Sequence, residues 1–204
     1  MKIHVFVATT QGLVAIQNIT AIDDVEISSV VSINGTSTTA NISSAYHNFV
    51  KKAAGIIEHD FGACSYRLNI DKRIDQGNSW QLAFYLAHAA HQQNILGDGQ
   101  VKLGDQIICA TGEVNTSSRV IQSINDLPRK QKFAAQQIKQ WHQQKLKVSF
   151  LVPQDNTADI DKTLPLNIKR VNTLEQALSY LQLESNALSK AKQPPAAALE
   201  KNTI

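Results

Sequence analysis

Short apolar, β-branched segments alternate along this chain with longer stretches of helical spacing, and this alternation constrains the fold more than any other feature. Strand-like segments occupy residues 2–8, 13–16, 25–33, 64–70, 106–111 and 148–152, with a shorter one at 120–121. Apolar residues recur at helical spacing over 43–58, 79–90, 127–142 and 173–181. The interleaving of both kinds predicts an α/β domain with a mixed sheet and flanking helices.

Turn and cap residues mark several element boundaries. Gly12 predicts a hairpin between the first two strands, and Asn34-Gly35 a turn after the third. The segment 97–99 (Gly-Asp-Gly) is expected to be another hairpin turn. Pro128 suits the first turn of a helix, and Thr173 begins a capping box.

The composition indicates a chain that builds its own core. Of its 204 residues, 43% are hydrophobic and 18% charged, so disulfides or metal ions are not needed as staples. We expect one domain over residues 1–185, followed by a loosely ordered tail over residues 186–204. The two cysteines, Cys64 and Cys109, belong to no ligand cluster and are expected to be free thiols in a reducing compartment. A disulfide between them is the alternative.

Charge and hydropathy restrict the partners. Lys and Arg total 20 against 17 Asp and Glu, and the basic residues are dispersed, so no nucleic-acid partner is expected. No apolar stretch is as long as a membrane span, and the N-terminal apolar run is too short for a signal peptide. We expect a cytoplasmic protein that does not bind membranes.

The histidines do not indicate a metal site. His88 and His91 are three residues apart on one predicted helix, so they can share a side. No HExxH pattern or clustered Asp, Glu or Cys accompanies them. The sequence predicts that both lie on a solvated flank, and that the protein uses no metal and no cofactor.

Ser79 has two interpretations, because it follows a glycine-containing loop and opens an amphipathic helix. As an N-cap it would bond the first amides of the helix. As a nucleophile it would use nearby amides to hold an oxyanion, and it would need a base. The GxSxG elbow is absent because Gln81 replaces its second glycine, and no histidine is placed for a triad. A buried lysine with a lowered pKa is a suitable base.

Several segments in order resemble the proteolytic domain of Lon proteases, over roughly residues 3 to 182. Gly77-Asn78-Ser79, with the Leu-Ala pairs that follow, resembles the GPSAG motif and its helix. Ala110-Thr-Gly-Glu-Val114 is similar to the TGE strand end of that family. The other matching segments are Gly12-Leu-Val14 with the helix near Ala45, Val120-Ile121, Leu127-Pro-Arg-Lys130, Ala134-Ala135, Leu151-Val-Pro153, Asn156 and the helix that follows Val171.

The resemblance implies a Lon-like fold and a Ser–Lys dyad. Ser79 would be the nucleophile and Lys130 its general base, with Lys132 as the base in a shifted register. Thr111 would support the lysine amine, and Glu113 would be structural. The implied function is an ATP-independent endopeptidase that cuts peptides or unfolded segments. A separate ATPase, another binding partner and self-association are partners that the resemblance leaves open.

The segment around Ser79 departs from the family pattern. Asn78 replaces a proline, Trp80-Gln81 replace Ala-Gly, and Gln76 replaces an aspartate. Trp80 would either reshape the substrate groove or pack into the core. We expect no ATPase module before the domain, and the alternative function is therefore a non-catalytic scaffold or partner-binding domain of the same fold.

Overall fold

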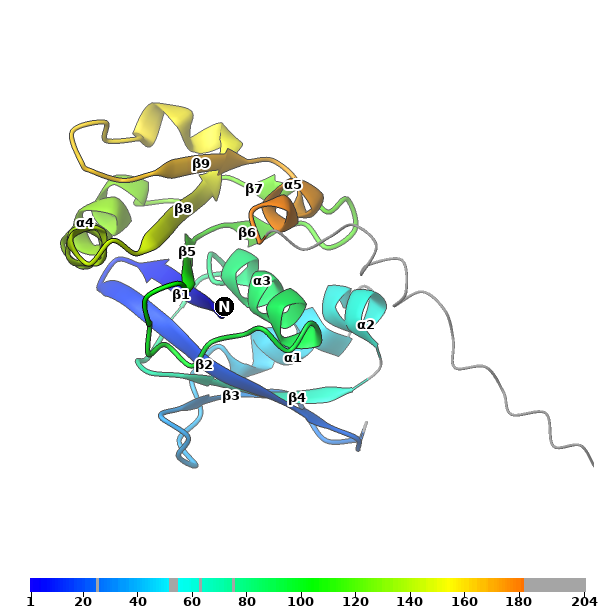
Figure 1. Cartoon of the computed structure of the whole chain (residues 1–204). Helices are drawn as coiled ribbons and strands as arrows, with labels where there is room; N and C mark the ends of the chain where they lie inside the picture. The colour runs from blue at the N-terminus through cyan, green and yellow to red at the C-terminus, as the bar shows by residue number, and fades with distance from the viewer. Residues whose placement is uncertain (25, 52–54, 63, 75, 182–204) are drawn as a thin grey trace, which may run out of the picture.

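Seven strands form one mixed sheet in the order β3-β4-β2-β1-β5-β8-β9 (Figure 1). The computed structural model describes residues 1–181 except residues 25, 52–54, 63 and 75, so the predicted tail over residues 186–204 lies outside the described residues. The elements in chain order are β1 (Ile3–Thr9), β2 (Gly12–Ile22), β3 (Val30–Ile33), α1 (Ser43–Lys51), α2 (Ile56–Phe61), β4 (Ser65–Ile70), α3 (Gln81–Gln92), β5 (Gln106–Ala110), β6 (Glu113–Val114), β7 (Ile121–Gln122), α4 (Leu127–Gln143), β8 (Lys147–Pro153), the 3-10 helix η1 (Gln154–Asp159), β9 (Ile168–Val171) and α5 (Leu174–Ser179).

The sheet combines a parallel half with an antiparallel half, as the alternating pattern predicts. β1, β5, β8 and β9 are parallel neighbours. β2 pairs antiparallel with β1 and with β4, while β3 pairs parallel with β4. β6 and β7 form a separate two-stranded ribbon. Hence the mixed α/β class is confirmed.

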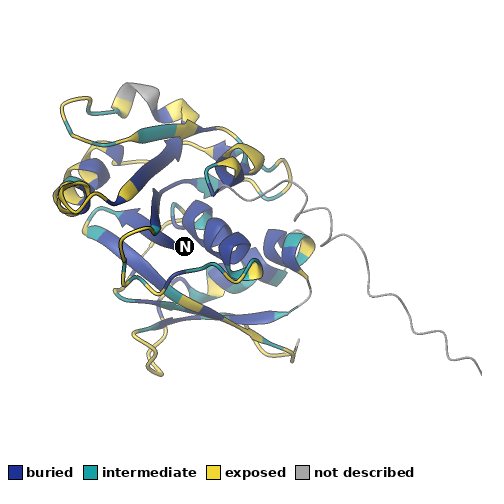
Figure 2. Cartoon of the chain, viewed as in Figure 1, coloured by how far each residue is buried: buried dark blue, intermediate teal, exposed yellow. Residues whose placement is uncertain are grey.

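The central strands send alternate side chains into two cores, because successive residues of a strand face opposite sides. Ile3, Val5 and Val7 of β1 belong to the core that α1, α2, α3 and α5 share on one face. Phe6 and Ala8 belong to the second core, which α4 covers on the other face. In Figure 2 the strands and α3 are mostly buried, while α4 keeps an exposed outer side.

α3 is buried on every side, which periodicity alone did not predict. Every residue from 82 to 90 is buried. His88 is therefore a core residue, 1% exposed, whose Nε2 lies 2.8 Å from the Tyr46 hydroxyl. The prediction of a solvated flank for His88 is wrong because Tyr46 of α1, Phe61 of α2 and Tyr66 of β4 pack around its ring.

Some predicted boundaries need correction. The helix expected over 43–58 is two helices, and Gly55 lies between them in close contact with the backbone of Val50, where a Cβ would approach the carbonyl oxygen to 2.3 Å. The strand expected over 25–33 pairs only over β3, because the Ser29 amide donates to Nδ1 of His47 and not to a neighbouring strand.

The segment 97–99 is not a hairpin turn. Gly97 packs against the ring of His4, since a Cβ there would lie 2.4 Å from that ring, and its amide donates to the Ile3 carbonyl. The chain then enters β5, which runs parallel to β1 and so cannot form a hairpin with it.

Other expectations agree with the structure. Asn34 and Gly35 both have positive φ, as a tight turn of this type requires. The Thr173 hydroxyl accepts from the Gln176 amide at the start of α5. Cys64 and Cys109 are free thiols. In the described part of the chain, no helix is both long and apolar enough to cross a membrane.

Candidate active site

Ser79 lies in the turn that leads into α3, beside the end of β5. Its carbonyl accepts from the Gly112 amide at 2.9 Å, and the Leu82 amide donates back to the Gly112 carbonyl at 3.1 Å. The Ser79 side chain makes no cap bond to the helix, whose N-cap is Trp80. The N-cap interpretation of Ser79 is therefore wrong, and its hydroxyl is free to meet other groups.

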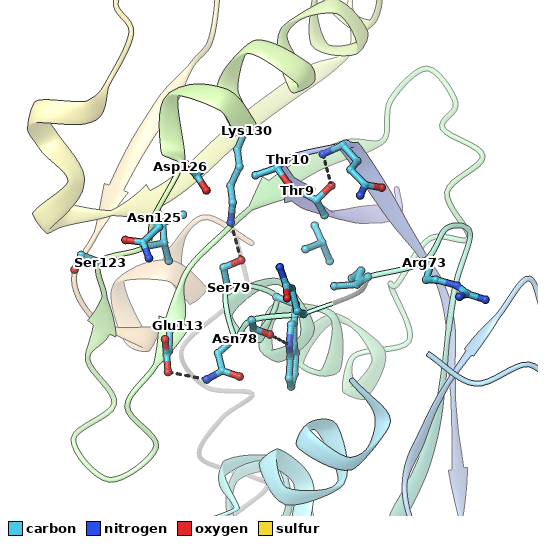
Figure 3. A pocket seen from close by; sticks show the side chains of 17 residues that line it. Thr9, Thr10, Arg73, Asn78, Ser79, Glu113, Ser123, Asn125, Asp126 and Lys130 are labelled. Carbon is cyan, nitrogen blue, oxygen red and sulfur yellow. Dashed lines mark hydrogen bonds between the residues drawn. The ribbon is translucent and has the colours of Figure 1, made fainter. Parts of the chain in front are cut away.

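The Ser79 hydroxyl meets a lysine from the opposite side of the sheet. Nζ of Lys130, in the first turn of α4, lies 2.6 Å from Oγ of Ser79 (Figure 3). The same Nζ lies 3.0 Å from Oγ1 of Thr111. The first distance lies within the reach required for proton transfer. Three residues separated by 32 and 19 positions in the sequence thus meet at one point.

Thr111 orients the lysine. It is fully buried directly after β5, and its hydroxyl donates to the Ser79 carbonyl across 3.5 Å. Because its proton is used there, its oxygen lone pairs are left to accept an N–H of Lys130. A neutral lysine amine has two N–H groups and one lone pair. Holding one N–H on Thr111 allows the lone pair to face the Ser79 hydroxyl.

The surroundings of Lys130 favour the neutral amine. The side chain is 6% exposed, and burial lowers its pKa to about 8 from an ordinary value of 10.5, while the Asp126 carboxylate opposes this shift. At pH 7 this raises the fraction of free amine from about 0.03% to about 9%, roughly 300-fold. Lys132, the alternative base, is exposed two residues further along α4.

A pocket of about 560 Å³ opens over the Ser79 hydroxyl. Its walls come from the β1–β2 turn, the loop before Ser79 and the segment before α4, and its charged lining residues are Arg73, Glu113, Asp126 and Lys130. Figure 3 shows Glu113 and Asp126 on one side of Ser79 and Arg73 on the other. Most of the lining residues are polar, unlike the mainly apolar lining of small-molecule pockets.

Trp80 packs into the core and does not fill the pocket. It is 1% exposed, its ring contacts the rings of Tyr46, Phe49 and Phe84, and its Nε1 donates to the Gly77 carbonyl at 2.7 Å. Of the two interpretations of Trp80, core packing is confirmed.

Sequence reasoning named the three residues that meet, and it missed most of the pocket wall. Thr9, Thr10 and Arg73 line the pocket from segments that no motif singles out. Asn78 and Glu113 were noted separately, yet the Asn78 amide donates to Oε1 of Glu113 at 2.9 Å. These residues could be assigned to one site only from the way the segments pack, because their spacing in the sequence matches neither a helix nor a strand repeat.

Two comparisons bear on identity, and neither assigns a family. No protein-family model matches this chain, and no curated protein matches it significantly. In the described residues, no group of three or more His, Cys, Asp or Glu side chains is placed to hold a metal ion. The chemistry of the Ser79 pocket therefore carries the functional interpretation.

Proposed function

We propose that the protein is an ATP-independent serine endopeptidase of the Lon type, with Ser79 as nucleophile and Lys130 as general base. One observation carries the proposal: a buried lysine with a lowered pKa lies 2.6 Å from the hydroxyl of a serine at the floor of an open pocket. Burying the charge of a lysine destabilises the fold, so stability gives no reason for Lys130 to lie in these surroundings. A role in proton transfer would account for its position.

Acylation begins when the free amine of Lys130 accepts the proton of the Ser79 hydroxyl. Oγ then attacks the scissile carbonyl carbon, and the carbonyl oxygen takes the negative charge. Among the described residues, no acceptor is bonded to the backbone amides of Ser79 and Trp80, so these are the donors that would hold the oxyanion. When the intermediate collapses, the C–N bond breaks, and the Lys130 ammonium returns its proton to the departing amine.

Deacylation repeats the same steps with water. Lys130 accepts a proton from a water molecule, and the hydroxide attacks the acyl carbon. The ester bond to Ser79 breaks, and the lysine proton returns to Oγ. Thr111 keeps the amine oriented through both halves, since its hydroxyl contacts Nζ without exchanging a proton. Peptides and unfolded segments are the proposed substrates, because the pocket is open and can accept an extended chain.

The test is covalent labelling of Ser79 together with cleavage of unfolded protein in the absence of ATP. A fluorophosphonate should label the wild-type protein and leave Ser79→Ala and Lys130→Gln unlabelled, while Ser118→Ala, at an exposed serine, should be labelled fully. Fluorescent casein should be cut by the labelled forms only, with a loss of several orders of magnitude in the first two variants. Cleavage that persists in Ser79→Ala would refute the proposal.

The non-catalytic alternative predicts a different result from the same experiment. A scaffold domain would give no labelling in any form, although every variant unfolds cooperatively. In that case, the search should turn to protein partners. The placement of Trp80 removes one reason for preferring that alternative, because this side chain leaves the pocket open.

A further inference from the structure

We infer that Asn78 and Gln81 are positioning residues, which hold Ser79 against Lys130 by tying the Ser79 turn to β6. The inference rests on the proposed function and deepens it. Both residues lie at positions where the sequence differs from the GPSAG motif. Asn78 replaces a proline and Gln81 a glycine, and neither of those residues has a polar side chain that could form these hydrogen bonds. Both act through the turn and contact neither Lys130 nor its partner Thr111 by a hydrogen bond.

The first tie lies directly before the nucleophile. The side-chain amide of Asn78 donates to Oε1 of Glu113 across 2.9 Å, and Glu113 is the first residue of β6 (Figure 3). An amide bonded to a carboxylate is a charge-assisted hydrogen bond, which is shorter and stronger than a neutral one. Gly77, with φ of +78°, takes a left-handed backbone conformation directly before this tie, which glycine adopts without strain.

The second tie lies two residues after the nucleophile. The Val114 amide donates to Oε1 of Gln81 across 2.8 Å, and Val114 is the other residue of β6. One main-chain bond, from the Gly112 amide to the Ser79 carbonyl, lies between the two side-chain ties. The Ser79 turn is therefore fixed on both sides to one short strand.

That strand also leads to the base. β6 pairs with β7, with Glu113 opposite Gln122 and Val114 opposite Ile121. β7 runs through only four residues into α4, which carries Lys130. The ribbon of β6 and β7 therefore connects the turn that holds the nucleophile with the helix that holds the base. A shift of about 1 Å between such groups is enough to lower a rate by about 100-fold.

A reciprocal exchange of donor and acceptor tests the first tie. In Asn78→Asp, two carboxylates face each other, so kcat should fall about 10- to 100-fold while KM changes less than about threefold. Glu113→Gln keeps a hydrogen-bond acceptor but removes its charge, and this variant should lower kcat about two- to fivefold. The double variant, N78D with E113Q, reverses the tie: the new amide on β6 donates and the new carboxylate before Ser79 accepts. Its kcat should therefore return to near that of Glu113→Gln.

The second tie has its own pair of variants. Gln81→Leu removes the acceptor for the Val114 amide and should lower kcat about tenfold, while Gln81→Glu keeps an acceptor and should recover most of that loss. Asn69→Asp is the matched control, because Asn69 also donates from its side chain to a partner side chain, Asn18, at 2.6 Å, but neither residue lines the pocket. It should leave kcat unchanged. All variants should melt within a few degrees of the wild type.

A measurement that does not depend on turnover separates the positioning role of these residues from the proposed peptidase function. The titration midpoint of the Lys130 amine, followed by NMR of ¹⁵N-labelled lysine, should move upward in Gln81→Leu, which changes no charge, as the site opens to water. An unchanged midpoint and kcat in Gln81→Leu, or a double variant whose kcat is no better than that of Asn78→Asp, would overturn the inference. If the wild type is not labelled and does not cleave while the midpoint moves in Gln81→Leu, then the proposed function fails and the positioning stands.

Discussion

Replacing the proposed base with an apolar residue of similar length should stabilise the protein at neutral pH, although it abolishes activity. Lys130 is 6% exposed, and folding lowers its pKa from 10.5 to about 8. Because the folded state binds this proton more weakly than the unfolded state, the charge of Lys130 disfavours folding at every pH below 8. The wild-type protein regains that stability as the pH rises from about 8 towards 10.5.

The size of the effect follows from the two pKa values. Linkage gives a cost of about 3 kcal/mol at pH 7 and about 1 kcal/mol at pH 10. Lys130→Met removes the titrating group and leaves two hydroxyls, those of Ser79 and Thr111, without their partner. That loss is the same at both pH values. The stability difference between Lys130→Met and the wild type should therefore be about 2 kcal/mol more favourable to the variant at pH 7 than at pH 10.

Urea unfolding followed by tryptophan fluorescence measures this difference directly. The free energy of unfolding should be determined for both proteins at intervals from pH 7 to pH 10, with activity measured on the same samples. Lys132→Met, at an exposed position on the same helix, is the control for losing one positive charge. If the difference between Lys130→Met and the wild type stays constant across this range, then Lys130 is not held in an environment that disfavours its charge, and the basis for its role as a base is lost.

Three further predictions use other parts of the structure. The rate of Ser79 acylation should rise about tenfold per pH unit below pH 8 and level off above it, because only the free amine of Lys130 is active; stopped-flow labelling at several pH values measures this, and a flat profile would contradict it. Trp80→Ala should lower the free energy of unfolding by about 3–5 kcal/mol, measured in urea, since a fully packed indole is lost; a change below about 1 kcal/mol would show that the ring does not support the core. Burial lowers the pKa of His88 from 6.5 to about 3, with a smaller effect from His91, so the protein should lose stability as the pH falls below 6.5, by about 3 kcal/mol at pH 4. The free energy of unfolding of His88→Gln should fall correspondingly less between pH 7 and pH 4. An equal fall in both proteins would refute the conclusion that His88 is buried in its neutral form.

The order of elements could be predicted from the sequence because local signals determine it. Pro128 lies at the start of α4 as predicted, and Thr173 caps α5. β9 was missed because it is only four residues long and mostly half-exposed at the sheet edge, which leaves no alternating pattern to detect. The burial of His88 was missed for another reason. Helical periodicity reports one apolar face, whereas the side chains that cover His88 come from α1, α2 and β4, which lie elsewhere in the sequence.

The candidate site shows the same division between local and non-local information. Ser79, Thr111 and Lys130 were named from motif order, which fixes their sequence positions but not their separation in space. The 2.6 Å contact depends on α4 and α3 lying on opposite faces of the sheet and meeting at the end of β5. The tie between Asn78 and Glu113 depends on the turn before α3 lying beside the segment that follows β5. No pattern within either segment predicts it.

The place of Trp80 follows from helix geometry. Trp80 has helical φ and ψ of −75° and −20°, and successive residues of a helix point about 100° apart. A residue directly after Ser79 therefore points away from the Ser79 hydroxyl, towards the interior that Tyr46, Phe49 and Phe84 already form. A large side chain at this position fills the core, anchors the turn through its bond to Gly77, and leaves the pocket open. A bulky neighbour in sequence is thus weak ground for predicting a blocked nucleophile, and the residues that decide whether Ser79 can react are those across the pocket from it.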